Sequence, residues 1–251
     1  MTLEEAIQMA NNGNTSAMLA VGDSYFENKD FTEALKYYEM AGEDGSCLGM
    51  QKSMLLRCIM ARTLRDLHEW DDVVKHCEKM YYWSRYILNI QNTSDAGLFS
   101  KEDYDKAYQY ALQALYVGGM AYWFQKDFQN ALEASVGLEN AQLQILHGLS
   151  LFYLANSEDE YCKVLQELKI LETNNWYPND ADHYDDVIFT AAAQTLAMLY
   201  REGISGKADL QHAHQALLSV YNVVKSADQK AKLSSELSHY HMSKFGGFTY
   251  S

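Results

Sequence analysis

Apolar residues recur along most of the chain at the three- and four-residue spacing of amphipathic helices. In the recurring pattern, a small residue is followed three positions later by an aromatic residue on the same helical face. A short turn of Asn, Lys and Asp then leads to Phe or Trp, which opens the next segment. The pattern predicts helices over residues 2–12, 14–28, 30–43, 46–67, 70–91, 101–125, 127–137, 139–155, 158–173, 183–202, 207–224 and 227–243.

Short polar sequences at the predicted helix starts support these assignments. Capping pairs, in which an acidic residue follows the capping residue by three positions, are Thr2 with Glu5, Asp30 with Glu33, Ser100 with Asp103, and Ser157 with Glu160. The helical pattern is interrupted at 92–97 and 174–186, and residues 244–251 form a non-helical aromatic tail. We expect a single α-solenoid domain over 1–251, with 92–100 as the candidate boundary between its two halves.

The amino-acid composition favours the same fold class. Pro178 is the one proline in 251 residues, whereas an all-β chain of this length uses proline in its many turns. Helix interiors exclude proline because it lacks an N–H group and clashes with the preceding turn. Hydrophobic residues make up 48% of the chain, which is enough for a substantial core. We therefore predict an all-α fold of about twelve helices.

Two segments of the chain align without a gap. Residues 22–35 and 119–132 share Gly, Tyr, Lys-Asp-Phe and Ala-Leu in register. Looser copies of the pattern begin at Ala61, Gly148 and Ala197. The small residue is expected to let the second helix of each pair approach the first closely. Because one such pair cannot bury its apolar faces alone, we expect the pairs to stack on one another.

This arrangement resembles the tetratricopeptide and Sel-like repeat superfamily. The segment 13–46 matches best, and the segment 193–213 is similar to the Sel-like form, in which the turn between the helices is longer. The resemblance implies a right-handed helical-repeat solenoid of antiparallel helix pairs. The spacing of the small marker residues is irregular, at positions 22, 61, 119, 148 and 197, instead of a constant interval of about 34. A degenerate array with irregular joints is therefore expected.

The charge of the chain narrows the classes of partner. Asp and Glu number 34 against 20 Lys and Arg, which gives a net charge of −14. This charge repels nucleic acid, and the densest basic stretch, 57–65, holds only three arginines. No segment approaches the ~20 apolar residues of a membrane span, and the N-terminus lacks the features of a signal peptide. We expect a cytoplasmic protein that binds neither nucleic acid nor membranes.

Candidate catalytic or metal-binding residues are few. The acidic loop 179–186 begins like a calcium loop around His183, but no mid-loop glycine or late glutamate follows. A solvated loop that caps the next helix is the simpler interpretation. The four cysteines form no CxxC pair, and reduced thiols are expected in the cytoplasm. Two pairs of histidines are spaced two residues apart, which places the rings about 200° apart on a helix: His212 with His214, and His239 with His241. We expect no catalysis, cofactor or metal.

The repeat resemblance also implies a ligand groove. It would be lined by the residues of each first helix that face away from the second helix. Carried over position by position, these are Asp23, Phe26 and Glu27; Arg62, Arg65 and Asp66; Tyr116, Met120, Trp123 and Phe124; Leu149, Phe152 and Tyr153; and Gln194, Met198, Arg201 and Glu202. The middle of this surface would be aromatic and its N-terminal end charged, which suits a peptide with apolar anchors. The alternative is that further helices cover the surface and make it core.

These observations favour a non-catalytic module that binds a protein or peptide, and the negative net charge favours a basic partner. A structural scaffold that self-associates is the first alternative. The tail 244–251 either caps the chain's own last repeat or docks on a neighbouring subunit and makes a homo-oligomer. An enzyme or metal-binding protein that uses the 179–186 loop is the third hypothesis.

Overall fold

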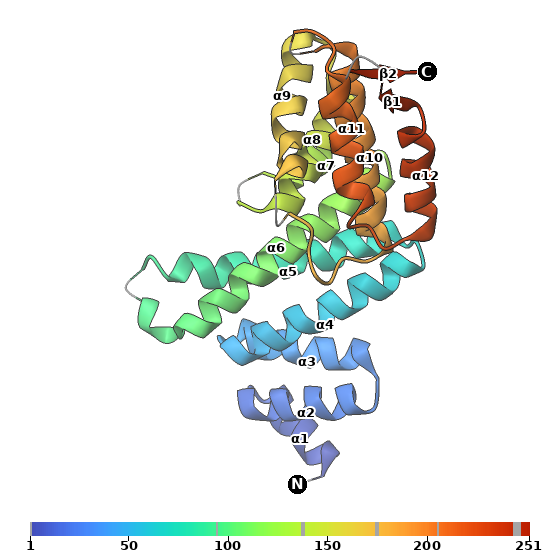
Figure 1. Ribbon diagram of the computed structural model, residues 1–251. Coiled ribbons are helices and arrows are strands. Elements are labelled where there is room, and N and C mark those ends of the chain that lie inside the picture. The colour runs from blue at the N-terminus through green and yellow to red at the C-terminus, as the bar shows by residue number, and fades with distance from the viewer. Residues whose placement is uncertain (1, 94, 137–138, 174–175, 205, 243–246) are drawn as a thin grey trace. The chain divides into compact units, whose positions relative to one another are not determined.

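The computed structural model describes residues 2–93, 95–136, 139–173, 176–204, 206–242 and 247–251 (Figure 1). Across these residues the chain forms twelve α-helices, two 3₁₀ turns and one two-stranded hairpin. The predicted all-α fold is confirmed. The chain divides into two compact units, Met1–Gln125 and Lys126–Ser251, and each is described by itself. No helix within the described ranges is long and apolar enough to cross a membrane.

The first unit is a succession of antiparallel helices, each packed against the next along the chain. Its elements are α1 (Leu3–Asn11), α2 (Thr15–Glu27), α3 (Phe31–Glu43), α4 (Cys47–Asp66), α5 (Trp70–Ile90), η1 (Ala96–Leu98) and α6 (Lys101–Phe124). The predicted capping boxes at Thr2 and Ser100 are present. The candidate boundary at 92–100 lies inside this unit, where it joins α5 to α6, and these two helices pack along each other.

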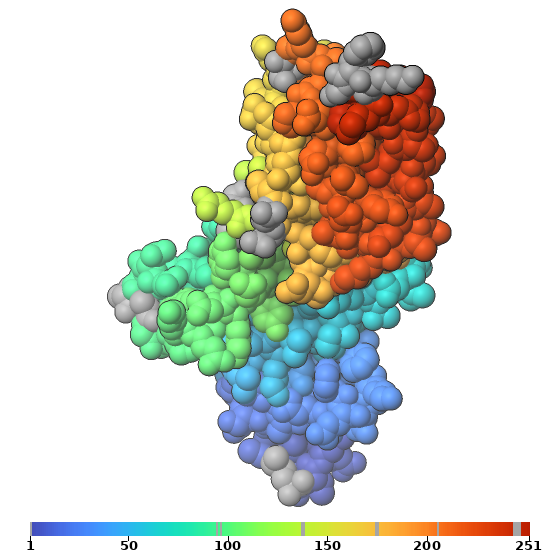
Figure 2. Space-filling model, viewed as in Figure 1, coloured from blue at the N-terminus to red at the C-terminus, as the bar shows by residue number. Residues whose placement is uncertain are grey.

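The second unit packs α8 against α7, α9 and α10, while α11 contacts α10 and α12. Its elements are α7 (Phe128–Ala134), α8 (Ala141–Leu154), α9 (Glu158–Leu168), η2 (Lys169–Glu172), α10 (His183–Glu202), α11 (Leu210–Tyr221), α12 (Ala227–Leu237), β1 (Tyr240–Met242) and β2 (Phe248–Tyr250). Side chains of α11 and α12, in orange and red, form much of the face of this unit seen in Figure 2.

The last predicted helix, 227–243, extends past the end of the observed helix. Helix α12 stops at Leu237, and residues 240–242 form a strand that pairs antiparallel with β2, so that Tyr240 lies opposite Tyr250. Strand β2 packs on α11, which gives the hairpin a partner that helical periodicity does not reveal. The described part of the tail is non-helical, as expected.

The aligned segments share a turn conformation. Lys29, His68 and Lys126 hold the same place in three copies of the pattern, and their φ angles are 62°, 61° and 63°. No other non-glycine residue in the described ranges has a positive φ. The amide of Lys29 donates to the carbonyl of Phe26 at 3.0 Å, and His68 makes the equivalent bond to Arg65 at 2.9 Å. The internal repeat seen in the sequence therefore has a counterpart in backbone geometry.

Small residues allow close helix crossings, as the pattern predicts. A Cβ atom built on Gly22 would lie 2.6 Å from Cε1 of Tyr38 on α3. A Cβ atom on Gly148 would lie 2.8 Å from Cδ2 of Leu168 on α9. In both pairs the glycine lies on the first helix and the contacted residue on the second. A larger side chain at either position would have to displace these neighbouring side chains or separate the two helices.

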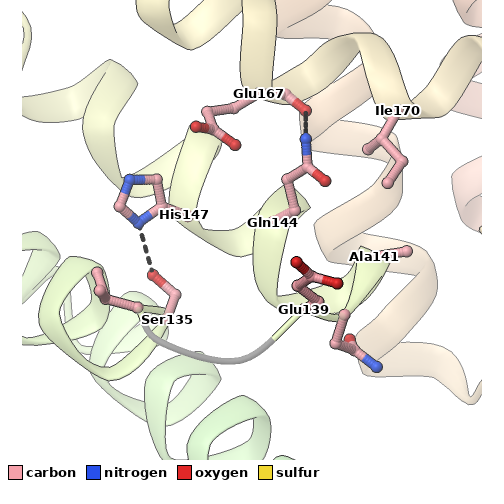
Figure 3. Close-up of a pocket in the computed structure, with 9 residues that line it drawn as sticks. Ser135, Glu139, Ala141, Gln144, His147, Glu167 and Ile170 are labelled. Carbon is pink, nitrogen blue, oxygen red and sulfur yellow. Dashed lines mark hydrogen bonds between the residues drawn. The ribbon is translucent and has the colours of Figure 1, made fainter.

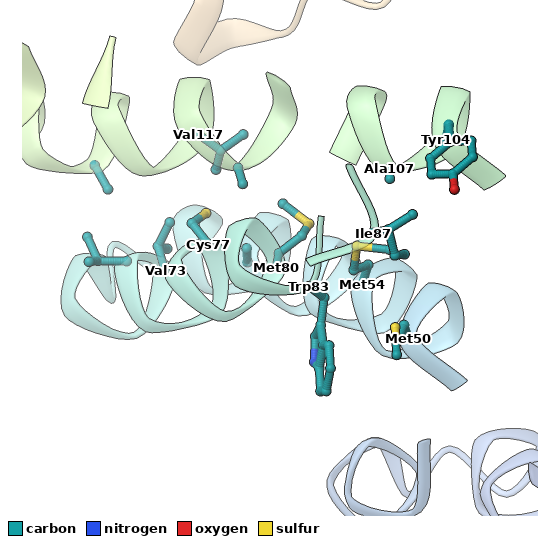
Figure 4. Close-up of a cluster of buried hydrophobic side chains, with 14 of the residues drawn as sticks. Met50, Met54, Val73, Cys77, Met80, Trp83, Ile87, Tyr104, Ala107 and Val117 are labelled. Carbon is teal, nitrogen blue, oxygen red and sulfur yellow. The ribbon is translucent and has the colours of Figure 1, made fainter. Parts of the chain in front are cut away.

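One buried cluster of the first unit lies between α4, α5 and α6 (Figure 4). Met50 and Met54 of α4 and Val117 of α6 pack in one cluster with residues of α5. The contribution from α5 follows its helical period: Val73, Cys77, Met80, Trp83 and Ile87. Burying each large apolar side chain stabilises the fold by roughly 1.5–3 kcal/mol. Because Met50 and Met54 are buried in this cluster, the opposite side of α4 faces away from α5 and α6.

Candidate functional site

Asp23, a predicted groove residue, forms structural contacts within the first unit. Its carboxylate accepts a hydrogen bond from the Tyr38 hydroxyl of α3 at 2.7 Å and pairs with the ammonium group of Lys52 on α4. The Lys52 ammonium also lies 5.3 Å from the centre of the Tyr38 ring. Burial, followed by the bond to Asp23, raises the pKa of Tyr38. Asp23 thus ties α2 to the two helices that follow it.

The other predicted residues of α2 and α4 differ in exposure. Phe26 and Glu27 are exposed, and the ring of Phe26 lies 5.6 Å from that of Phe31 at the start of α3. Arg62 is exposed on α4, whereas Arg65 is buried. Phe26, Glu27 and Arg62 are therefore available to a ligand.

The predicted groove residues of α6 are mostly interior. Tyr116 and Met120 are buried, and they belong to an unbroken run of six buried residues, 116–121. A helix buried at six successive positions is covered on all sides, so Tyr116 and Met120 do not line an open groove. This is a correction for these two residues, and its cause is that α6 carries apolar residues all around its axis.

Trp123 and Phe124, at the end of α6, are partly buried. The ring of Phe124 stacks on Trp70 of α5 at 5.0 Å with an interplanar angle of 7°. Trp123 meets Phe124 edge to face at 5.3 Å. The stack of Phe124 on Trp70 joins the end of α6 to the start of α5, and Trp123 packs on Phe124.

The predicted residues of α8 and α10 lie in the second unit. Phe152 and Met198 are partly buried, and Tyr153 is exposed on one side while its ring stacks on Phe128 of α7 at 4.1 Å. Phe152 lies 6.0 Å from Tyr161 of α9. Tyr153 thus remains half exposed, and Phe152 packs toward α9.

Arg201 contacts the C-terminal hairpin and helix α12. Its guanidinium lies 4.4 Å over the ring of Tyr250 and 3.1 Å from the carboxylate of Glu236. On the same hairpin, Phe248 stacks on His214 of α11 at 4.8 Å. The described part of the tail therefore packs on its own chain, in the manner of a cap. Phe245, also assigned to the tail, lies outside the described residues.

Helix α4 carries an exposed apolar row that the sequence pattern does not distinguish from core. Leu48, Leu55 and Ile59 are 50%, 47% and 39% exposed. Their spacing of seven and four residues places them on one helical face, which we call the α4 row. The signal was present in the sequence, but it resembles that of the core residues Met50 and Met54 on the same helix. Only the packing distinguishes the two sets.

A pocket of about 550 Å³ adjoins the α4 row. One wall is the turn between α2 and α3, from Asn28 to Thr32, and the other is formed by α4, including Ile59 and Met60. Phe31 lines this pocket and corresponds to Trp70 in the next copy of the pattern. There, the Trp70 ring stacks on an aromatic residue, Phe124, whereas α4 presents aliphatic residues and Thr63 to Phe31.

The acidic loop 179–186 is a structural element. Asp182 caps α10 by accepting the amides of Tyr184 and Asp185 at 2.9 and 3.3 Å. Capping was expected, but Asp185 and Asp186 are buried instead of solvated. In the described parts of the chain, no group of three or more His, Cys, Asp or Glu residues is arranged to hold a metal ion.

The surroundings of the cysteine thiols of Cys47 and Cys77 disfavour their use as nucleophiles. All four cysteines are free. Burial raises the pKa of Cys77 to about 12, and burial with the nearby Asp103 carboxylate raises that of Cys47 to about 12. A thiol with such a pKa stays protonated near neutral pH and is a poor nucleophile.

One serine–histidine contact lies in a second pocket, of about 610 Å³, in the second unit (Figure 3). Ser135 Oγ lies 3.2 Å from His147 Nδ1, but the Ser135 hydroxyl donates its proton to the carbonyl of Leu132 at 2.8 Å. Nδ1 must then be the donor to Oγ. His147 is therefore not placed to take a proton from Ser135, so this pair lacks the arrangement of an activated nucleophile.

Neither a comparison with models of known protein families nor a comparison with curated proteins gives a match for this chain.

Proposed function

We propose that this chain is a non-catalytic helical-repeat module that binds a protein or peptide through the α4 row and the adjoining pocket. The repeated turn conformation and the glycine crossings support a stacked array of helix pairs, in keeping with the resemblance to tetratricopeptide and Sel-like repeats. Its free thiols suit the reducing environment of the cytoplasm, where we propose that it acts.

The exposed row is the observation that carries this proposal. Leu48, Leu55 and Ile59 leave between 39% and 50% of their surface in contact with water, on one face of a 20-residue helix. Covering each remaining surface would contribute on the order of 1 kcal/mol to association. Contiguous exposed apolar residues of this kind are typical of protein interaction sites. The neighbouring pocket provides a place for one larger anchor side chain.

Charges beside the row indicate what the partner carries there. Helix α4 has four basic residues and no acidic residue before Asp66. Arg62 is exposed on this helix and forms no ion pair with any described residue. An acidic side chain of the partner would complement Arg62. At this surface we therefore expect apolar anchors with an acidic neighbour, even though the whole chain is acidic.

Affinity capture from a native lysate tests the proposal. The bait proteins are the wild type, Leu55→Glu, Ile59→Glu, and Leu98→Glu as the matched control, since Leu98 is 71% exposed on η1, outside the row. We expect the wild type and Leu98→Glu to retain the same partner. The two α4 variants should lose it, because a buried carboxylate without a counter-ion opposes association.

Two further measurements show whether the α4 variants stay folded and whether the captured partner is a second copy of the chain. Thermal melts of the α4 variants should match the wild type, because the row is exposed. Sedimentation of the free protein over a range of concentrations separates a foreign partner from a second copy of the chain. Equal retention of the partner by all four proteins would reject the α4 row as the binding surface.

A further inference from the structure

A pocket of the second unit presents an unusual set of polar groups. It lies where α7 ends, α8 begins, and α9 passes into η2. Figure 3 shows Glu139, Gln144, His147 and Glu167 arranged around one hollow. The volume of about 610 Å³ is ample for one long side chain of another protein. The hydrogen bonds around its wall determine which atoms are left to face a ligand.

Two side chains of α8, Gln144 and His147, carry acceptor atoms in the wall. Since Ser135 donates to Leu132, a neutral His147 ring that donates from Nδ1 presents Nε2 to the pocket as an acceptor. Gln144 Nε2 donates to the backbone carbonyl of Glu167 at 3.1 Å. This bond fixes the orientation of the amide, so that Oε1 of Gln144 is its free end.

At the start of α8, the side-chain oxygen of Asn140 is used in capping the helix, while its Nδ2 group is a donor in the wall. The Asn140 side chain accepts the amides of Gln142 and Leu143 at 2.9 and 3.1 Å, so these donors are already used. The wall also contains the two carboxylates of Glu139 and Glu167. Glu139 is exposed and Glu167 partly exposed, and neither forms an ion pair with any residue that the structure describes. The wall therefore combines carboxylates from the segment before α8 and from α9 with two side chains of α8 that carry acceptor atoms.

We propose that this pocket binds the guanidinium group of an arginine side chain presented by a partner protein. A guanidinium is positively charged and has five N–H donors and no acceptor, which complements the two carboxylates and the acceptor atoms of this wall. Its planar fork reaches acceptors on several sides, whereas the compact ammonium of lysine does not. The aliphatic part of the arginine would lie against Val136 and Ile170, which also line the pocket.

This inference rests on the proposed function in one respect, because it assumes a protein partner. In this view the partner carries an arginine that binds the pocket of the second unit, in addition to the apolar side chains that bind α4. It also gives a specific site to the basic partner that the net charge of −14 favours.

The test uses capped tripeptides with the full-length protein. Ac-Gly-Arg-Gly-NH₂ is titrated while the signals of the His147 ring and the Gln144 amide are followed by NMR. Peptides with citrulline or lysine in the central position serve as comparisons, since citrulline has the shape of arginine without its charge. We expect saturable shifts at both residues with the arginine peptide, binding at least about tenfold weaker with citrulline, and intermediate or weak binding with lysine.

Variants that each remove one carboxylate charge test whether the arginine peptide binds in this pocket. Glu167→Gln and Glu139→Gln should each weaken arginine binding at least about fivefold. Glu158→Gln, which removes an exposed carboxylate at the start of α9 away from the pocket, should leave it unchanged. Circular dichroism of each variant verifies the fold. Equal binding of arginine and citrulline, or arginine binding that is insensitive to both pocket variants, would overturn the proposal.

The two proposals fail in distinguishable ways. If the arginine peptide does not bind while the α4 variants still lose the captured partner, the pocket assignment is wrong and the α4 surface stands. If the peptide binds with the expected selectivity while capture ignores Leu55→Glu, the pocket stands and the α4 surface is rejected.

Discussion

Gly49 shows how one side-chain atom controls a helix crossing. It lies in the first turn of α4, and a Cβ atom there would be 2.7 Å from the amide nitrogen of Gly42 and 2.8 Å from Cβ of Ala41. The nearest atoms include backbone, which cannot rotate away. We expect Gly49→Ala to lower the free energy of unfolding by about 1–3 kcal/mol, despite the better helix propensity of alanine.

Urea denaturation measures this effect. Gly97→Ala is the matched control, because a Cβ atom at Gly97 has no neighbour within 4 Å. The control should change stability by less than about 0.5 kcal/mol. Equal stability of Gly49→Ala and the control would contradict the close crossing of α3 and α4.

His76 makes stability depend on pH through a network shared by three helices. Arg57 of α4 donates to the carboxylate of Glu39 on α3 and to Nδ1 of His76 on α5, the latter at 3.2 Å. Burial lowers the pKa of His76, and the positive charge of Arg57 lowers it further. The folded protein therefore resists protonation of this ring.

The consequence is a loss of stability in mild acid. Above the ordinary histidine pKa of about 6.5 the contribution is complete, and it is lost as pH falls from there toward the lowered pKa of the folded state. We expect His76→Gln, which keeps an acceptor for Arg57, to flatten the decline in unfolding free energy between about pH 7 and pH 5. The exposed His183→Gln is the control. A decline as steep in His76→Gln as in the wild type would count against this assignment.

At the scale of elements, the repeated turn carries a defined strain. A residue other than glycine in the left-handed region costs roughly 1–2 kcal/mol, and Lys29 holds φ at 62°. We expect Lys29→Gly to raise stability by about 0.5–1 kcal/mol, since glycine adopts this conformation freely but loses more entropy on folding. Lys36→Gly, in the exposed part of α3, should lower stability by about 1 kcal/mol. Destabilisation by both changes would contradict the shared turn geometry.

The helices were predictable because their signals are local. Capping pairs such as Thr2 with Glu5 and Ser100 with Asp103 act within a single turn, and the structure contains both. The hairpin was not predictable in this way, because Phe248 depends on His214, 34 positions away. Periodicity thus identified the elements, although it extended the last helix past its true end.

The candidate site was less predictable than the elements. A register carried over from a regular repeat placed Tyr116 and Met120 in a groove, yet both are interior. Conversely, Leu55 and Ile59 have the sequence features of core residues but remain exposed. Whether an apolar helical face is covered depends on which other elements pack against it. Spacing within one helix does not contain that information.

At the scale of the whole molecule, the chain consists of two compact units, and we expect their local stabilities to respond separately. Asp186 of the second unit is 1% exposed and accepts hydrogen bonds from the Tyr177 hydroxyl and the amides of Lys225 and Ser226, at 2.9, 2.8 and 2.6 Å. Its carboxylate thereby fixes the segment that enters α12. Burial and the bond to Asp186 raise the pKa of Tyr177.

Asp186→Asn should destabilise the second unit by about 1.5–3 kcal/mol, because an amide offers one acceptor oxygen where the carboxylate offers two. Hydrogen exchange should accelerate in α10–α12 and remain unchanged in α2–α5. The exposed Asp180→Asn, in the same loop, is the control. A similar acceleration in both units would show that they unfold together.

The most direct test of the binding surface is site-specific photo-crosslinking in living cells of the source organism. A benzophenone amino acid replaces Leu55 in one protein and Leu98 in another, since both positions are exposed but only Leu55 belongs to the α4 row. We predict a discrete crosslinked species from position 55 that is absent from position 98. No crosslink at position 55, or the same crosslink from both positions, would contradict the account of α4 as the partner-binding surface.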